Sequence, residues 1–303
     1  MTMTANTNLQ AAALALAASA ILSLIDNFVA SVAEEAGLWQ FQIFRTLFAL
    51  PLLVLLGRAL RVSVRPKRWG RLTLRSVAVS AGLLLYFASL GTMPVAQAGA
   101  GLFSAPIWVL LLSAAFFGAR IGGLHVLAVL CGFGGALMVL QPDPAALSAM
   151  TFLPLAAGAL YGFGMLLTRE ICADESPAAL AIGIFSIIGL FSLGMVGVTA
   201  LAPGETFLTR PWVPVTPRFL WLTLFQAAGA VIAVTLIAQA YRIGRPAQVA
   251  VFEYSFLVFA AFWGLALWGI ATDAVSWIGV AIIITSGVLI AGLHLTAHKS
   301  RTA

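Results

Sequence analysis

Three ionisable side chains, Asp26, Arg45 and Glu253, stand inside long apolar stretches of this 303-residue sequence. A charge at the centre of a lipid bilayer costs about 2.5–3.5 kcal/mol, so each of them needs a partner or a hydrated cavity. Asp26 and Arg45 lie at similar depths on consecutive, antiparallel stretches. Their placement predicts a structural ion pair, and a role of Asp26 in binding a solute or a proton is the alternative.

Glu253 lies in another stretch, with no Lys or Arg expected at its depth. A carboxyl group buried without a cation favours its protonated form, so Glu253 is a candidate proton carrier. It would equally suit the ammonium group of a solute. The third interpretation is a carboxylate that is hydrogen-bonded to neighbouring hydroxyls such as that of Tyr254.

Other polar and aromatic side chains interrupt the apolar stretches and are candidates for the wall of a central cavity. Aromatic rings would stack on a flat or apolar solute, while amide and carboxyl groups would orient its polar end. For any single residue, packing or a hydrogen bond to its own helix is the simpler role. The candidates are Asn27, Tyr86, Gln97, Trp108, Tyr161, Gln226, Glu253 and Tyr254.

Ten apolar stretches of membrane-spanning length account for most of the chain. Hydrophobic residues make up 62% of it and charged residues 9%, with a mean hydropathy of +1.05. About 20 apolar residues cross a bilayer core, where the backbone must satisfy its own hydrogen bonds, so helices are predicted. The sequence therefore predicts an all-α integral membrane protein. The expected spans are 10–33, 38–57, 72–93, 95–117, 121–140, 151–171, 178–201, 218–241, 247–270 and 274–293.

Lys and Arg gather on one side of these spans. With the N-terminus in the cytoplasm, 13 of the 16 basic residues fall on that side, whereas the other side holds only Arg210 and Arg218. The positive-inside rule then predicts cytoplasmic termini; a bacterial cytoplasmic (inner) membrane is what the family resemblance given below implies. This bias, together with anionic lipid at the inner leaflet, explains the net charge of +6, so no nucleic-acid partner is expected.

The two halves of the sequence resemble each other. Residues 16–20 match 155–159 at an offset of 139, and Ser104 and Gly118 match Ser255 and Gly269 at an offset of 151. The acidic pairs at 34–35 and 174–175 fall near the same register. Because five helices are an odd number, the second copy is inverted. Residues 1–145 and 146–303 are therefore predicted to form two inverted five-helix repeats around one central cavity, an arrangement typical of transporters.

Catalytic and metal-binding patterns are absent from the sequence. The three His residues are dispersed, and the two thiols, Cys131 and Cys172, fall within or near the ends of helices, so neither a metal site nor a structural disulfide is expected. The sequence holds no hydrolase elbow, no zinc-protease motif and no nucleotide-binding loop. We therefore expect no enzyme activity and no cofactor.

Four short motifs resemble the drug/metabolite transporter superfamily and, within it, the ten-helix EamA family. Residues 27–30 are similar to the family's signature in its first helix, and Arg45 stands where the second helix usually has an Arg. Pro106 matches a Pro of the fourth helix, and residues 252–254 resemble the start of the ninth. The resemblance covers residues 10–293. The chain departs from the family where Gly118-Ala119 and Gly269-Ile270 replace the frequent Gly-Glu pairs.

The resemblance implies secondary transport by alternating access, with the first, third, fourth, sixth, eighth and ninth helices around the path. Family members chiefly export amino acids and related metabolites, and the sequence is similar to the bacterial aromatic amino-acid exporter. We therefore expect export of amino acids, with large apolar or aromatic side chains favoured and broad specificity. Carriage of another small metabolite or drug in either direction is the alternative. A membrane receptor or structural protein is the alternative outside transport.

The charge asymmetry generates the first prediction. A cysteine introduced in place of Arg65 should react with an impermeant maleimide only from the cytoplasm, and one in place of Arg210 only from outside. Labelling in intact cells and in inverted vesicles measures this, in a background without Cys131 and Cys172. The reverse pattern would overturn the orientation.

Overall fold

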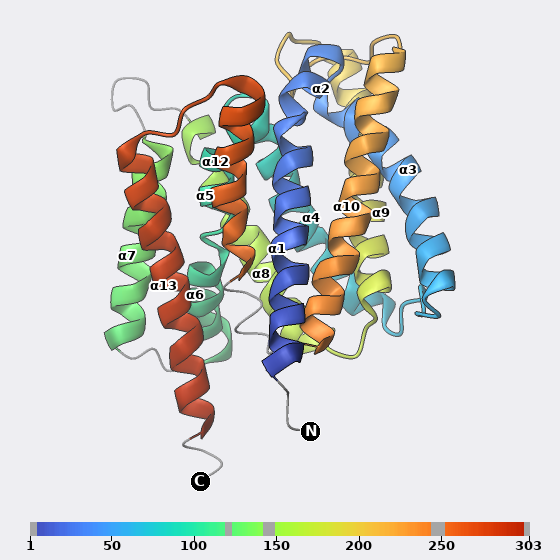
Figure 1. Cartoon of the computed structure of the whole chain (residues 1–303). Coiled ribbons are helices and arrows are strands. Elements are labelled where there is room, and N and C mark those ends of the chain that lie inside the picture. The colour runs from blue at the N-terminus through green and yellow to red at the C-terminus, as the bar shows by residue number, and fades with distance from the viewer. Residues whose placement is uncertain (1–4, 119–122, 142–148, 244–251, 300–303) are drawn as a thin grey trace.

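The computed structural model describes residues 5–118, 123–141, 149–243 and 252–299, and every regular element in that part of the chain is helical. Two columns each hold two described helices, α1 with α2 and α5 with α6. With these two pairs joined, the described helices form ten columns, as predicted (Figure 1). The helices are α1 (Ala5–Asn27), α2 (Val29–Glu35), α3 (Leu38–Ala59), α4 (Trp69–Leu90), α5 (Val95–Leu102), α6 (Ala105–Phe117), α7 (Gly123–Leu140), α8 (Ala149–Ile171), α9 (Pro177–Leu201), α10 (Pro217–Ile243), α12 (Ser255–Trp268) and α13 (Ala274–Lys299).

Seven of the described segments are long and apolar enough to cross a membrane. They are 9–35, 38–59, 69–90, 95–116, 150–168, 177–201 and 217–237, and shorter apolar helices cover parts of α7, α12 and α13. Lipid offers the backbone no hydrogen-bonding partner, which is why such segments close their hydrogen bonds within themselves. The chain is accordingly a multi-pass membrane protein.

Three helix boundaries fall inside the bundle rather than at its ends. α1 gives way to α2 at Phe28, whose N–H donates to the carbonyl of Ile25 (3.1 Å). The fourth column breaks between Phe103 and Ser104, and α12 begins after Tyr254. Breaks at this depth are tolerated where neighbouring helices cover the freed backbone groups.

The breaks repeat at the offset read from the sequence. Ser104 stands at the start of α6 and Ser255 at the start of α12, which are 151 positions apart. Both helices end at a glycine in the left-handed region, Gly118 with φ 65° and Gly269 with φ 67°. Residues with a Cβ rarely adopt this conformation, so glycine is the natural C-cap at both sites.

Contacts between helices follow the same symmetry. α1 packs on α10 and α12, and its counterpart α8 packs on α4 and on α5 with α6. The pairs α3–α9 and α7–α13 each join a helix to its own counterpart, and α5 of the fourth column packs on α12 of the ninth. Close approach is achieved with small residues: a Cβ on Gly82 of α4 would meet the backbone nitrogen of Tyr161 in α8 at 2.7 Å. Helices of the N-terminal and C-terminal halves of the chain therefore interleave in one bundle.

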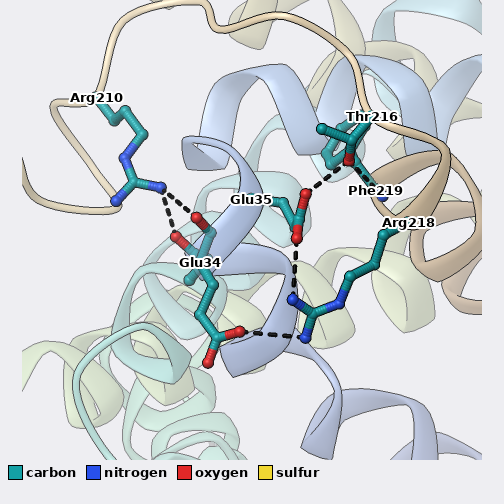
Figure 2. A network of polar contacts seen from close by, with 7 residues as sticks. Glu34, Glu35, Arg210, Thr216, Arg218 and Phe219 are labelled. Carbon is teal, nitrogen blue, oxygen red and sulfur yellow. Dashed lines mark hydrogen bonds and ion pairs between the residues drawn. The ribbon is translucent and has the colours of Figure 1, made fainter.

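At each end of the bundle a glutamate carboxylate holds a connecting segment by hydrogen bonds, an arrangement called a clasp below. At the end that carries α2, Glu35 accepts hydrogen bonds from Thr216 Oγ1 (2.6 Å) and Arg218 Nη1 (3.0 Å), and Arg218 also pairs with Glu34 at 3.2 Å. Figure 2 shows this network together with Arg210, whose guanidinium donates to the carbonyls of Ala33 (2.8 Å) and Glu34 (3.1 Å). The connection before α10 is thereby fixed to the end of α2.

An equivalent clasp lies at the opposite end, where α1 begins. Glu175, 140 positions after Glu35, accepts from the backbone N–H of Lys67 (2.9 and 3.0 Å) and of Arg68 (2.8 Å), just before α4. Nearby, buried Arg75 donates to Thr168 Oγ1 at 2.7 Å. The Glu35 clasp joins the end of α2 to the start of α10, and the Glu175 clasp joins the segment after α8 to the start of α4. In both cases the first column of one repeat is held to the third column of the other.

The two clasps should differ in strength. Glu175 is 8% exposed and receives charge-assisted bonds from fixed backbone donors, so Glu175→Gln should lower the free energy of unfolding by about 1–3 kcal/mol. Glu35→Gln should cost only about 0–1 kcal/mol, because its ion partner Arg218 is 58% exposed and screened by solvent. Thermal unfolding of both variants in the same detergent measures the difference, and equal losses would contradict it.

Candidate functional site

A cavity of about 350 Å³ opens at the α2 end, between the α1–α2 break, the α4–α5 connection and α12. Its size falls within the range of about 300–1,000 Å³ that is usual for small-molecule sites. Most of its lining is apolar. Its polar side chains are those of Asp26, Asn27, Thr92 and Thr272, and the aromatic side chain on its wall is Trp268.

Asp26 lies near the end of α1, and the break that follows sets it on the cavity wall. Its side chain is 5% exposed, and Oδ2 accepts a hydrogen bond of 2.8 Å from the hydroxyl of Tyr86 in α4. The Gln226 amide lies beside it and donates to the carbonyl of Ile25. The adjacent Asn27 uses Nδ2 for the carbonyl of Ser23 at 2.8 Å. These contacts hold a carboxyl group in a fixed place beside the cavity.

The structure does not form the predicted direct ion pair of Asp26 and Arg45. The guanidinium of Arg45 lies instead over the rings of Phe87 (4.5 Å to the centroid) and Phe185 (5.3 Å), and its Nε has no hydrogen-bond partner. The reason is that the first and second columns do not pack on each other: α3 packs on α9 and α10, whereas α1 packs on α10 and α12. Asp26 and Arg45 still attract each other at longer range.

A second group of candidates lies deeper in the bundle. Phe103 stands 5.0 Å from Phe256 and 6.2 Å from Tyr254, measured between ring centroids. Along their helices, Phe103 and Tyr254 lie about 9–11 Å beyond the cavity-lining residues Ala96 and Ala260, at 1.5 Å per residue. This aromatic layer lies between the cavity and the opposite end.

The remaining predicted residues do not line the cavity in the described part of the chain. Glu253 is half-buried, and its charge acts on Tyr161 and Tyr254, so it is not an isolated acid. The Trp108 ring packs on Phe133 at 5.1 Å. Gln97 is half-buried in α5.

Sequence reasoning missed Thr92 and Trp268. Both stand near the ends of apolar stretches, where a Thr reads as a turn residue and a Trp as an interfacial anchor. Trp268 packs edge-on against Phe28 at 5.8 Å, directly at the α1–α2 break. Among the described residues, no group of three or more His, Cys, Asp or Glu side chains could hold a metal ion.

Comparison with known proteins agrees with this architecture. Residues 9–141 match the EamA-like transporter family. The N-terminal part of the chain is therefore similar to that family. A solved crystal structure superimposes on 93% of this EamA-like chain and 96% of its own with a TM-score of 0.64; at 17% identity this similarity concerns the fold alone.

Curated relatives of this EamA-like chain are named as transporters. The riboflavin transporter of Rhizobium johnstonii is 29% identical over 84% of this chain and 80% of its own length. The riboflavin transporter of Brucella anthropi is 26% identical over 88% and 89%. The pseudopaline exporter CntI of Pseudomonas aeruginosa is 23% identical over 90% and 93%. The chain is therefore a membrane transporter, and these names do not confirm the expected amino-acid substrates.

The contacts of Arg45 generate a prediction. Arg45→Lys should destabilise the protein almost as much as Arg45→Ala, because a lysine lacks the flat guanidinium that lies on two rings at about 0.5–2 kcal/mol each. The double variant Asp26→Asn with Arg45→Gln should be more stable than Arg45→Gln alone, because either change alone leaves one buried charge without its opposite charge. Melting temperatures in detergent measure both effects, and a wild-type value for Arg45→Lys would contradict the first.

Proposed function

We propose that this EamA-like protein is a secondary transporter that carries riboflavin, or a solute of the same flat and polar-tailed kind, by alternating access. The observation that carries the proposal is the cavity, in which one aromatic ring and a largely apolar lining accompany a few polar groups. Relatives named as riboflavin transporters that align with most of the chain support the same substrate.

The chemistry of the lining suits such a solute. A flat heteroaromatic ring would pack on Trp268 and the neighbouring apolar side chains, because stacking needs only a π-face. Hydroxyl groups of a polar tail would donate to Asn27 Oδ1 and Thr92 Oγ1, whose donors are already used by the carbonyls of Ser23 and Ser89. Both side chains therefore present acceptors to the cavity.

Alternating access would follow from the interleaved repeats. The cavity reaches the α2 end, and the layer of Phe103, Tyr254 and Phe256 lies toward the other end. These rings stand at the breaks of the fourth and ninth columns, where a helix can bend with little loss of hydrogen bonding. Exchange of conformations between the two repeats would close the α2 end and part the rings.

The membrane orientation belongs to the same proposal. Basic residues cluster on the α3–α4 connection, from Arg58 to Arg71, at the end away from α2. At the α2 end, Arg210 and Arg218 contact carbonyls and carboxylates of α2. We infer that the cavity faces away from the cytoplasm of a bacterial inner membrane, with both termini cytoplasmic.

A second candidate is export of aromatic amino acids. It is favoured by one observation, the carboxyl group of Asp26 on the cavity wall, which would meet an ammonium group. The apolar lining and Trp268 would take the side chain. Broad tolerance is expected here, because one methylene changes binding by only about 1–3 kcal/mol.

Counterflow in proteoliposomes tests both candidates. Vesicles loaded with unlabelled riboflavin should take up labelled riboflavin, and Trp268→Ala should raise the half-saturating concentration about tenfold through loss of a stacking surface worth about 1–3 kcal/mol. Trp277→Ala is the matched control, because Trp277 is similarly exposed (42% against 45%) but does not line the cavity. Counterflow of phenylalanine without riboflavin would favour the second candidate, and counterflow of neither would sink both.

A further inference from the structure

Asp26 is the cavity residue that binding of a neutral flat solute does not require. Its carboxyl group is 5% exposed, lines the cavity and accepts the hydroxyl of Tyr86. A charge so placed is costly at membrane depth. In the proposed function, Asn27 and Thr92 already accept the hydrogen bonds of riboflavin's polar tail. The acid at position 26 therefore needs another explanation.

The ionisable groups that face Asp26 are few. α4 contributes Tyr86 and α3 contributes Arg45, whereas the described α5 and α12, both packed on α1, contain no ionisable residue. α10 faces it with the neutral Gln226. The acids of α2, Glu34 and Glu35, lie at its far end and are held by Arg218. The charge on Asp26 therefore interacts with the Tyr86 hydroxyl, which contacts it, and with the Arg45 guanidinium, which acts on it from a distance.

We propose that Asp26 is a proton-binding site that couples solute movement to the proton gradient, with proton and solute moving in the same direction. This inference rests on the proposed function. With the cavity open, a carboxylate oxygen takes a proton from cavity water and becomes a neutral carboxylic acid. When the cavity opens on the other side, the acid returns that proton to water and the carboxylate re-forms. No other bond changes.

Coupling follows from the cost of closure. When the cavity closes around a solute, water leaves and the charge on Asp26 loses its hydration, which disfavours the closed state. Protonation removes the charge, and the Tyr86 hydroxyl still donates to the carboxyl group in either form. A proton thus favours the state through which the solute passes, and the solute favours proton binding by the same factor.

The surroundings favour a proton over a metal cation. The groups nearest the carboxyl group are donors: the hydroxyl of Tyr86, the amide NH₂ of Gln226 and, further off, the guanidinium of Arg45. A sodium ion would need several oxygen ligands directed at it, and these N–H and O–H groups point the wrong charge toward it. A proton needs no such set of ligands: the carboxylic acid O–H would donate to cavity water while the other carboxyl oxygen still accepts from Tyr86.

The test uses the full-length protein in liposomes that contain a pH-sensitive dye, with riboflavin outside. The wild type should acidify the lumen as riboflavin enters, and an inward proton gradient should raise uptake several-fold over uptake without a gradient. Asp26→Asn should reduce that ratio to about one, and Asp26→Glu should restore most of it. Glu205→Gln, which removes an exposed carboxyl from the loop before α10, is the matched control and should keep the wild-type ratio.

Three results would overturn the assignment: an unchanged gradient ratio in Asp26→Asn, proton movement opposite to riboflavin, or loss of both uptake and counterflow in an Asp26→Asn protein that keeps the wild-type melting temperature. The last would make Asp26 a solute contact. A solute-independent measurement separates this inference from the proposed function. Infrared spectra on acidification should show a protonated carboxyl band in the wild type that Asp26→Asn lacks, even if riboflavin is not carried; its absence from the wild type also overturns the assignment.

Discussion

The scarcity of hydrogen-bonding partners in a bilayer governs this structure. It makes the described segments helical, and it restricts backbone breaks to columns that other helices surround. The breaks near Phe28, Phe103 and Tyr254 all lie on columns beside the cavity or beneath it. The same scarcity makes a buried charge costly, so the buried side chains of Asp26 and Arg45 have to be stabilised by their neighbours. Fold and site thus follow from one physical limit.

Symmetry then decides which helices can meet. Because the repeats interleave, the first column packs on the eighth and ninth rather than on the second, and its counterpart, the sixth, packs on the third and fourth. The clasps of Glu35 and Glu175 tie the same partners together at the two ends of the bundle. Each clasp therefore holds one packed pair of columns as a unit. The fourth and ninth columns, broken at Ser104 and Tyr254, carry the aromatic layer within this frame.

Much of this was predictable because apolar length and repeat spacing are local properties of a sequence. The ten columns follow from apolar length, and the offset of 151 anticipates the paired glycines at 118 and 269. The partner of Asp26 was not predictable in this way. Consecutive helices were expected to touch, yet the arrangement of ten helices brings Tyr86, 60 positions away, to the carboxylate and sends Arg45 to two phenylalanines. Trp268 escaped notice for a related reason: only the packing of the α12 end against Phe28 turns an interfacial ring into a cavity wall.

The residues proposed to contact the solute and the buried acid Asp26 lie in different parts of the structure. This separation suggests how such proteins can come to carry different substrates. The cavity-lining residues Thr92 and Trp268, the proposed solute contacts, stand on or beside connections at the α2 end, where substitutions disturb little of the helix packing. Asp26 accepts a buried hydrogen bond from Tyr86 of α4, and Gln226 of α10 donates to the neighbouring carbonyl of Ile25, so loss of one group leaves another without its buried partner. A transporter built this way can alter what it carries through the rim of its cavity while the charged centre stays fixed. That division would explain how relatives that align with most of this chain are named for solutes as different as riboflavin and pseudopaline.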